Sequence, residues 1–91
     1  MANNRRKEVN GITVKVSELL SAKKEAISAL ESQIQYEERN IKDYETSLIE
    51  ENEKPEEQRY DWRIEEFNRQ ITESKLKIVF FNEAIGAILD Y

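Results

Sequence analysis

The 91-residue sequence contains no cysteine, no histidine, one proline and two glycines. Without cysteine a disulfide scaffold is excluded, and without cysteine and histidine the usual structural zinc sites are excluded too. Catalytic pairs of a serine or cysteine nucleophile with a histidine base are equally impossible. Carboxylate-bridged metal sites in helical bundles also need histidine. We therefore expect no catalytic residue, no metal and no cofactor, and we expect that the protein is not an enzyme.

Long apolar runs are missing as well. No stretch reaches the roughly 18 apolar residues that cross a bilayer, so we expect no membrane partner. The charged N-terminal segment does not lead into the apolar core of a signal peptide. These features favour a cytoplasmic protein, in the host cytoplasm if it is phage-encoded. The net charge of −5 argues against direct binding to nucleic acid, because phosphate neutralisation supplies much of that affinity.

The scarcity of glycine and proline indicates long helices. These residues stand only at Gly11, Pro55 and Gly86, whereas an all-β chain needs turn residues at short spacing. Residues 12–16 alternate β-branched and polar side chains, which favours a short strand or else an earlier start of the first helix. Ser17, which is followed by an acidic residue, favours a helix start near residue 18.

Two seams of period seven flank Pro55. The recurring residues are Leu20, Ile27, Ile34, Ile41 and Leu48 before it, and Ile64, Ile71, Ile78 and Ile85 after it. A period of seven is typical of coiled coils. When the helices are paired antiparallel, the numbers of opposing residues add up to 108 and fifteen of eighteen seam positions are apolar. The sequence predicts an all-α fold, a long antiparallel helical hairpin (coiled coil) assembled into a helical-bundle oligomer, with a possible short N-terminal strand.

The expected organisation follows from these patterns. It comprises a flexible basic arm (residues 1–11) and a helical hairpin (12–91), with one helix at about 18–52, a turn at about 53–55 and a second helix at about 56–89. Proline is tolerated in the first turn of a helix, so we place Pro55 at the start of the second.

Three seam positions are polar: Lys23, Glu37 and Ser74. We favour the interpretation that the lysine and the glutamate lay their stems along the seam and keep their charges in water. Control of the helix register by buried polar groups is the alternative.

A second apolar stripe borders the seam in the half of the hairpin away from the turn. Its core, the predicted oligomer interface, is Leu19, Ala22, Ala26, Leu76, Phe80, Ala84 and Ala87. Val79, Leu89 and Tyr91 are expected to widen it. Because monomers rarely expose large contiguous apolar patches, we expect a homo-oligomer, with a dimer favoured. A cover formed by residues 12–16 and a different protein partner are the alternatives.

The charge is distributed unevenly along the chain. Residues 1–7 carry +3, whereas residues 31–66 hold thirteen acidic and five basic residues, a net charge of −8. Within this acidic region Trp62 is predicted to face away from the seam. It is either an interface hot spot or a ring folded across the turn onto Arg59. The candidate partner-binding residues are Trp62, Tyr36, Arg59, Arg63, Glu65 and Glu66.

These observations predict a non-enzymatic protein–protein interaction module that self-associates and acts by binding a protein partner. One alternative is a small acidic phage-type inhibitor, a counter-defence or nucleic-acid-mimic decoy that blocks a nucleic-acid-binding enzyme. The other is a structural or scaffold coiled coil.

Overall fold

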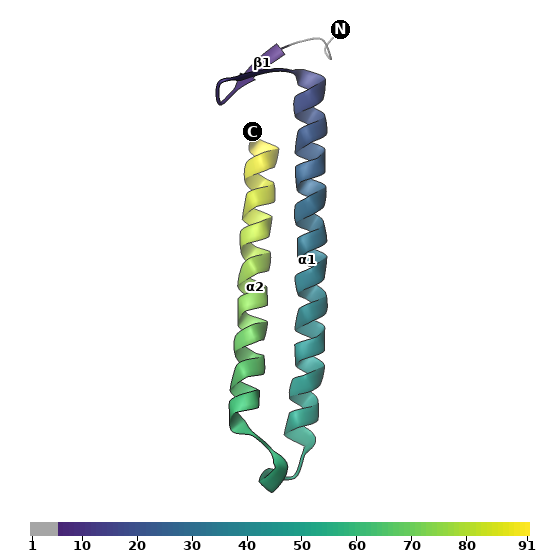
Figure 1. Cartoon of the computed structure of the whole chain (residues 1–91), viewed down its shortest axis with the longest axis vertical. Helices are drawn as coiled ribbons and strands as arrows, with labels where there is room; N and C mark the ends of the chain where they lie inside the picture. The colour runs from purple at the N-terminus through teal and green to yellow at the C-terminus, as the bar shows by residue number, and fades with distance from the viewer. Residues whose placement is uncertain (1–5) are drawn as a thin grey trace.

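The computed structural model describes residues 6–91, and the molecule is a rod of 70 × 19 × 15 Å. Its elements in chain order are β1 (Arg6–Val9), β2 (Ile12–Lys15), α1 (Val16–Glu53), the 3₁₀ helix η2 (Glu56–Gln58) and α2 (Asp61–Asp90). The two long helices run side by side in opposite directions (Figure 1), which confirms the predicted antiparallel helical hairpin. We call the end near the strands and the C-terminus the open end, and the end formed by residues 51–63 the tip.

The core is a thin seam, because each of two helices can cover only one stripe of the other. Among residues 6–91, Ile71 is the only buried hydrophobic residue, at 9% exposure, and it lies in the middle of the rod. Glu37, which lies opposite Ile71 in the same predicted layer, is 5% exposed. Ser74, which belongs to the adjacent layer, is 4% exposed. The neighbouring helix therefore covers the stem of Glu37, and its carboxylate oxygens are not among the buried atoms that lack a partner within residues 6–91, as expected for a stem laid along the seam.

The seam is shorter at both ends than the repeat predicts. Leu20 and Tyr60 are both seam positions, but they are 56% and 52% exposed. In the predicted register the last turn of α2 lies opposite the first turn of α1, so little of α2 remains to cover Leu20. Tyr60 precedes the first residue of α2 and has extended backbone, so its ring does not follow the helical repeat.

The start of α1 differs by two residues from the prediction. The carboxylate of Glu18 accepts a hydrogen bond from the backbone N–H of Lys15 at 3.4 Å, an acid in the first helical turn that satisfies the N–H of the preceding residue. As a result Val16 is the first helical residue and Lys15 occupies the capping position.

The start of α2 is where the prediction fails most. Pro55 has extended backbone (ψ 147°) and leads into η2, not into a long helix. Arg59 and Tyr60 are extended again, with ψ of 135° and 111°, so α2 begins only at Asp61. The turn between the long helices therefore spans residues 54–60. The proline sets the start of a 3₁₀ turn instead of the first turn of α2.

The N-terminal segment forms a two-stranded antiparallel β-hairpin. Arg6 pairs with Lys15 and Val9 with Ile12, and the turn residues Asn10 and Gly11 have φ of 50° and 83°. Positive φ at both central residues is the geometry of the tight turns that Asn-Gly favours. The predicted strand is confirmed over Ile12–Lys15. Residues 6–11 of the expected arm belong to this β-hairpin, and residues 1–5 lie outside the described residues.

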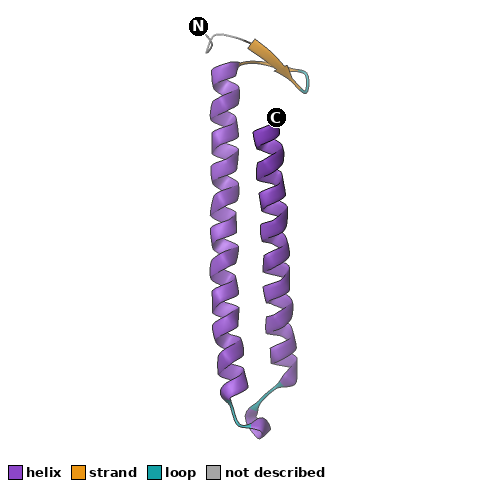
Figure 2. Ribbon diagram, turned by 180° about the vertical axis from the view of Figure 1, so that it is seen from behind, coloured by secondary structure: helices purple, strands orange, loops and turns teal. Residues whose placement is uncertain are grey.

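The β-hairpin lies across the open end, above the last turn of α2 (Figures 1 and 2). Val9 and Asn10 line an open groove of about 340 Å³ together with Ala22, Ala87 and Tyr91, and Lys23 and Ile88 complete its lining. The strands therefore cover the end of the helical pair and leave a gap above the helices.

Charged side chains of α1 contact both ends of α2. At its start, the Glu51 carboxylate accepts the backbone N–H of Tyr60 at 3.1 Å. At its end, the Lys23 ammonium group donates to the carbonyl oxygen of Leu89 at 3.5 Å. An anion at the N-terminus and a cation at the C-terminus of a helix are the charges that its dipole favours. Lys23 thus has a specific acceptor in addition to water.

Candidate interaction surfaces

The first candidate surface is the predicted oligomer interface, which we call the apolar face. Its large side chains are uncovered, since Phe80 is 61% and Leu76 is 50% exposed. Ala22, Ala26 and Ala87 are exposed as well, whereas Leu19 and Ala84 are half-buried. The β-hairpin leaves this surface open.

Helix geometry places these residues on one flank of the hairpin. In an antiparallel pair of helices the same heptad flank of each helix meets on the same side of the seam. Leu19, Ala22 and Ala26 lie on that flank of α1, and Phe80, Ala84 and Ala87 lie on the matching flank of α2. Leu76 borders this flank, so the seven residues form one continuous surface.

Two residues expected to widen this surface lie elsewhere. Val79 and Leu89 are 49% and 63% exposed, but their heptad positions place them on the opposite flank of α2. Tyr91 does continue the apolar face, and it lines the groove beneath the β-hairpin. At Gly86 an added Cβ would meet no atom within 4 Å, so this glycine does not serve a close contact within the described chain.

The second candidate surface is the tip, which is organised around Glu51. This carboxylate is 3% exposed, and its oxygens lie 3.0 Å from Lys54 Nζ and 3.6 Å from the Arg63 guanidinium. Its pKa lies below the ordinary value, chiefly because the backbone N–H of Tyr60 donates to the ionised form. Burial opposes this by raising the pKa, and the two cations lower it further. Glu51 is therefore an ionised anchor for the turn.

Trp62 is the most exposed aromatic residue of the tip, at 62%. The Arg63 guanidinium carbon lies 5.1 Å from the centre of the Tyr60 ring and 5.4 Å from that of Trp62. The alternative in which Trp62 stacks on Arg59 is wrong. Arg59 instead donates to the Lys54 carbonyl oxygen at 3.2 Å, and its Nε is buried without a hydrogen-bond partner among residues 6–91.

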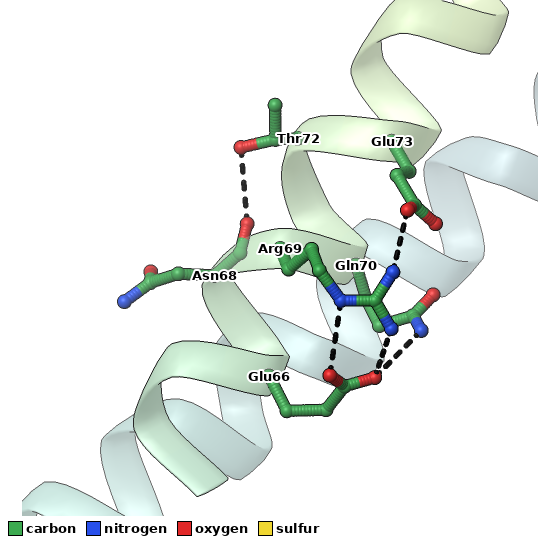
Figure 3. Close-up of polar contacts among 6 residues, drawn as sticks. All are labelled: Glu66, Asn68, Arg69, Gln70, Thr72 and Glu73. Carbon is green, nitrogen blue, oxygen red and sulfur yellow. Dashed lines mark hydrogen bonds and ion pairs between the residues drawn. The ribbon is translucent and has the colours of Figure 1, made fainter. Parts of the chain in front are cut away.

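A third feature is a charged cluster on α2 between the tip and the apolar face (Figure 3). Arg69 contacts Glu66 and Glu73 at 2.6 Å each, and Gln70 donates to Glu66 at 2.9 Å. The pKa of Glu66 is lowered, first by its hydrogen bond from Arg69, and the pKa of Arg69 is raised by the same contact. The cluster is thus internally paired, and Glu65 stays exposed without joining it.

The structure does not bring all the predicted partner-binding residues together. Trp62, Arg59 and Arg63 belong to the tip, Glu66 belongs to the charged cluster, and Tyr36 lies at the middle of α1 with 52% exposure. Sequence reasoning missed Glu51 and Lys54 because their role depends on the path of residues 54–60. The Asn-Gly pair was a signal for the β-hairpin that could have been used.

Within the part of the chain that the structure describes, no three acidic side chains gather closely enough to hold a metal ion. Neither long helix combines the length and the apolar character needed to cross a lipid bilayer. No protein-family model, curated protein or solved structure matches the chain. The exposed surfaces described above are therefore the features that bear on function.

Proposed function

We propose that the protein is a non-enzymatic interaction module that self-associates through the apolar face and binds a protein partner with its acidic half. The observation that carries this proposal is the exposure of Phe80 and Leu76 on one continuous apolar surface. Burying a side chain of this size contributes about 1.5–3 kcal/mol. In a symmetric dimer each contact occurs twice, so two such residues supply several kcal/mol towards association.

The molar mass in solution tests self-association. Size-exclusion chromatography with light scattering should give a multiple of the 10.8 kDa chain for the wild type and a lower mass for Phe80→Glu, because a carboxylate would be buried in the interface. Val79→Glu is the matched control, since it places the same charge on an exposed apolar site of the opposite flank. A wild-type monomer would contradict the proposal.

Partner binding is proposed for the tip because Trp62 is exposed and held beside Tyr60 and Arg63. Tryptophan, tyrosine and arginine are the residues that most often dominate interface energetics. A partner captured from the native host and identified by mass spectrometry should bind Trp62→Ala at least about tenfold more weakly than the wild type. Tyr36→Ala, an exposed aromatic far from the tip, is the control.

The acidic inhibitor is a second candidate function, favoured by the net charge of −8 over residues 31–66. The two candidates differ in the salt dependence of binding. Affinity that collapses between low and physiological salt supports the decoy, because exposed charges more than about 8 Å apart are screened there. Affinity that resists salt supports apolar contacts centred on Trp62. A purely structural coiled coil would bind neither a salt-sensitive nor a salt-resistant partner.

A further inference from the structure

The apolar face occupies only the open half of the rod. On α1 it runs from Leu19 to about Ala29, which is roughly 15 Å at 1.5 Å per residue. Towards the tip the same flank carries Tyr36, Glu66 and Glu73 in place of apolar residues. An occupant that covers the apolar face therefore needs to overlap only part of the 70 Å length.

The open end carries cations that have no ion-pair partner. Arg6 and Lys15 stand directly opposite each other in the β-hairpin, and like charges in this position repel. Among the ion pairs between residues 6 and 91, none involves Arg6, Lys7 or Lys15. The middle of the same chain is strongly acidic, so a second copy offers the charge that this end lacks.

The β-hairpin also leans towards the flank where a second copy would lie. Its residues Val9 and Asn10 line the groove together with Ala22, Ala87 and Tyr91, which belong to the apolar face or continue it. The paired cations Arg6 and Lys15 lie at the other end of the strands, directly before the first residue of α1.

From these observations we infer that the occupant of the apolar face is a second copy of the chain in antiparallel orientation. The two-fold axis crosses the rod near Ala26 and Ala84, at about the level of residue 25 of α1. Residue 15 in one copy then lies at the same height along the rod as residue 35 in the other copy. The β-hairpin of each copy therefore meets the region of Tyr36 and Glu73 of the other. This inference rests on the proposed self-association and adds the geometry of the contact.

A parallel dimer would bury the same apolar residues but at a higher electrostatic cost. It would place the two acidic regions of −8 side by side. In the antiparallel dimer the β-hairpin, which holds three cations and one acid, meets the acidic middle of the other copy at both ends of the overlap. The two Trp62 residues lie about 42 helical residues apart along the axis, or roughly 60 Å, which is far beyond the screening length.

The dimer then presents two tips in opposite directions and can bridge two partner molecules.

Distances between single spin labels test this arrangement, because the chain has no cysteine and every introduced thiol is unique. Ser32→Cys and Thr46→Cys place labels at exposed positions of α1 that face away from the seam. In the antiparallel dimer the labels at residue 32 are separated by about 20 Å along the axis, and those at residue 46 by about 60 Å. Double electron–electron resonance should therefore give a much longer distance for Thr46→Cys.

Equal distances at both sites, in a protein of dimeric mass, would establish a parallel dimer and overturn the inference while leaving the proposed function intact. A monomeric mass with no dipolar signal at either site would overturn the proposed self-association itself. A partner of another kind on the apolar face would give the same monomeric result in the purified protein.

Charge reversal provides an independent test of the same contact. Arg6→Glu and Glu73→Lys should each raise the dimer dissociation constant by about 3- to 10-fold, since a two-fold dimer contains each contact twice. The double variant should recover most of the wild-type affinity. Glu66→Lys, which adds the same charge and breaks the other ion pair of Arg69 one heptad nearer the tip, is the control, and its dissociation constant should change less than that of Glu73→Lys. Failure of the double variant to recover would overturn the proposed pairing.

Discussion

The tip and the open end are built from the same two helices, but they satisfy their side chains in different ways. At the tip, Glu51 collects a backbone N–H and two cations of its own chain, and it is 3% exposed. At the open end, Phe80 and Leu76 stay 61% and 50% exposed within the described chain, and a groove remains below the β-hairpin. At the tip the buried carboxylate finds its partners within one chain, whereas the large apolar side chains of the open end stay exposed, and our proposal assigns them to a second copy. Stability and association are therefore expected to respond to different mutations.

The largest effect is expected for the seam that both halves share. Ile71→Asp places a carboxylate at the best-covered apolar position and should lower the free energy of unfolding by about 3–5 kcal/mol. Urea unfolding followed by circular dichroism measures this change. Lys75→Asp, on the exposed surface of the same helix, should stay within about 0.5 kcal/mol of the wild type. An unchanged midpoint for Ile71→Asp would contradict the described seam.

A smaller effect of opposite sign is expected at Glu37, which separates the two halves. Its side chain is 5% exposed and has no hydrogen bond or ion pair with any residue from 6 to 91. Glu37→Leu should therefore raise the free energy of unfolding by about 1–2 kcal/mol. Glu38→Leu, its exposed neighbour, is the control in the same urea titration. A loss of stability would contradict this expectation.

The two glycines should respond in opposite directions, although both have free space around them. Gly86→Ala lies within α2 and should stabilise the chain by about 1 kcal/mol, because glycine is a poor helix former. Gly11→Ala should weaken the β-hairpin, since alanine rarely adopts a φ of +83°. Thermal unfolding measures the first change, and the amide chemical shifts of β1 and β2 measure the second. Stabilisation of the β-hairpin by Gly11→Ala would contradict the described turn.

The smallest effect on global stability is expected at the tip, at one extreme of the rod. Because the folded pKa of Glu51 is lowered, its stabilising contribution is present above the ordinary value of 4.5 and is lost as the pH falls through the folded pKa. The fluorescence of Trp62, the single tryptophan, should report this loss between neutral and acidic pH. In Glu51→Gln the corresponding transition should disappear. A transition of wild-type amplitude in this variant would assign the change to another carboxylate.

The helical hairpin could be predicted because period-seven repeats and a lone proline are local signals. Ile71 and Ser74 lie in the middle of the seam, where the repeat places them. The repeat could not show that Leu20 and Tyr60 stay exposed, because that depends on where each helix ends.

The candidate surfaces could be predicted to different extents. The heptad position alone places Phe80 outside the seam, so the exposure of this side chain could be predicted from the sequence. The choice of Arg63 over Arg59 as the partner of Trp62 was not, because both arginines lie within three residues of the ring. That choice depends on the extended backbone of residues 59 and 60, which aims Arg59 back towards Lys54.

The contacts at the two ends of α2 also restrict how the helices can be aligned. Isoleucine layers seven residues apart resemble one another, so the seam alone permits alignments shifted by a whole heptad. Glu51 and Lys23 are 28 residues apart, and the backbone groups they bind, on Tyr60 and Leu89, are 29 apart. Only one alignment satisfies both contacts. Deleting a heptad from α2 alone would preserve an apolar seam but remove one of its terminal charges, so the lengths of the two helices can change only together.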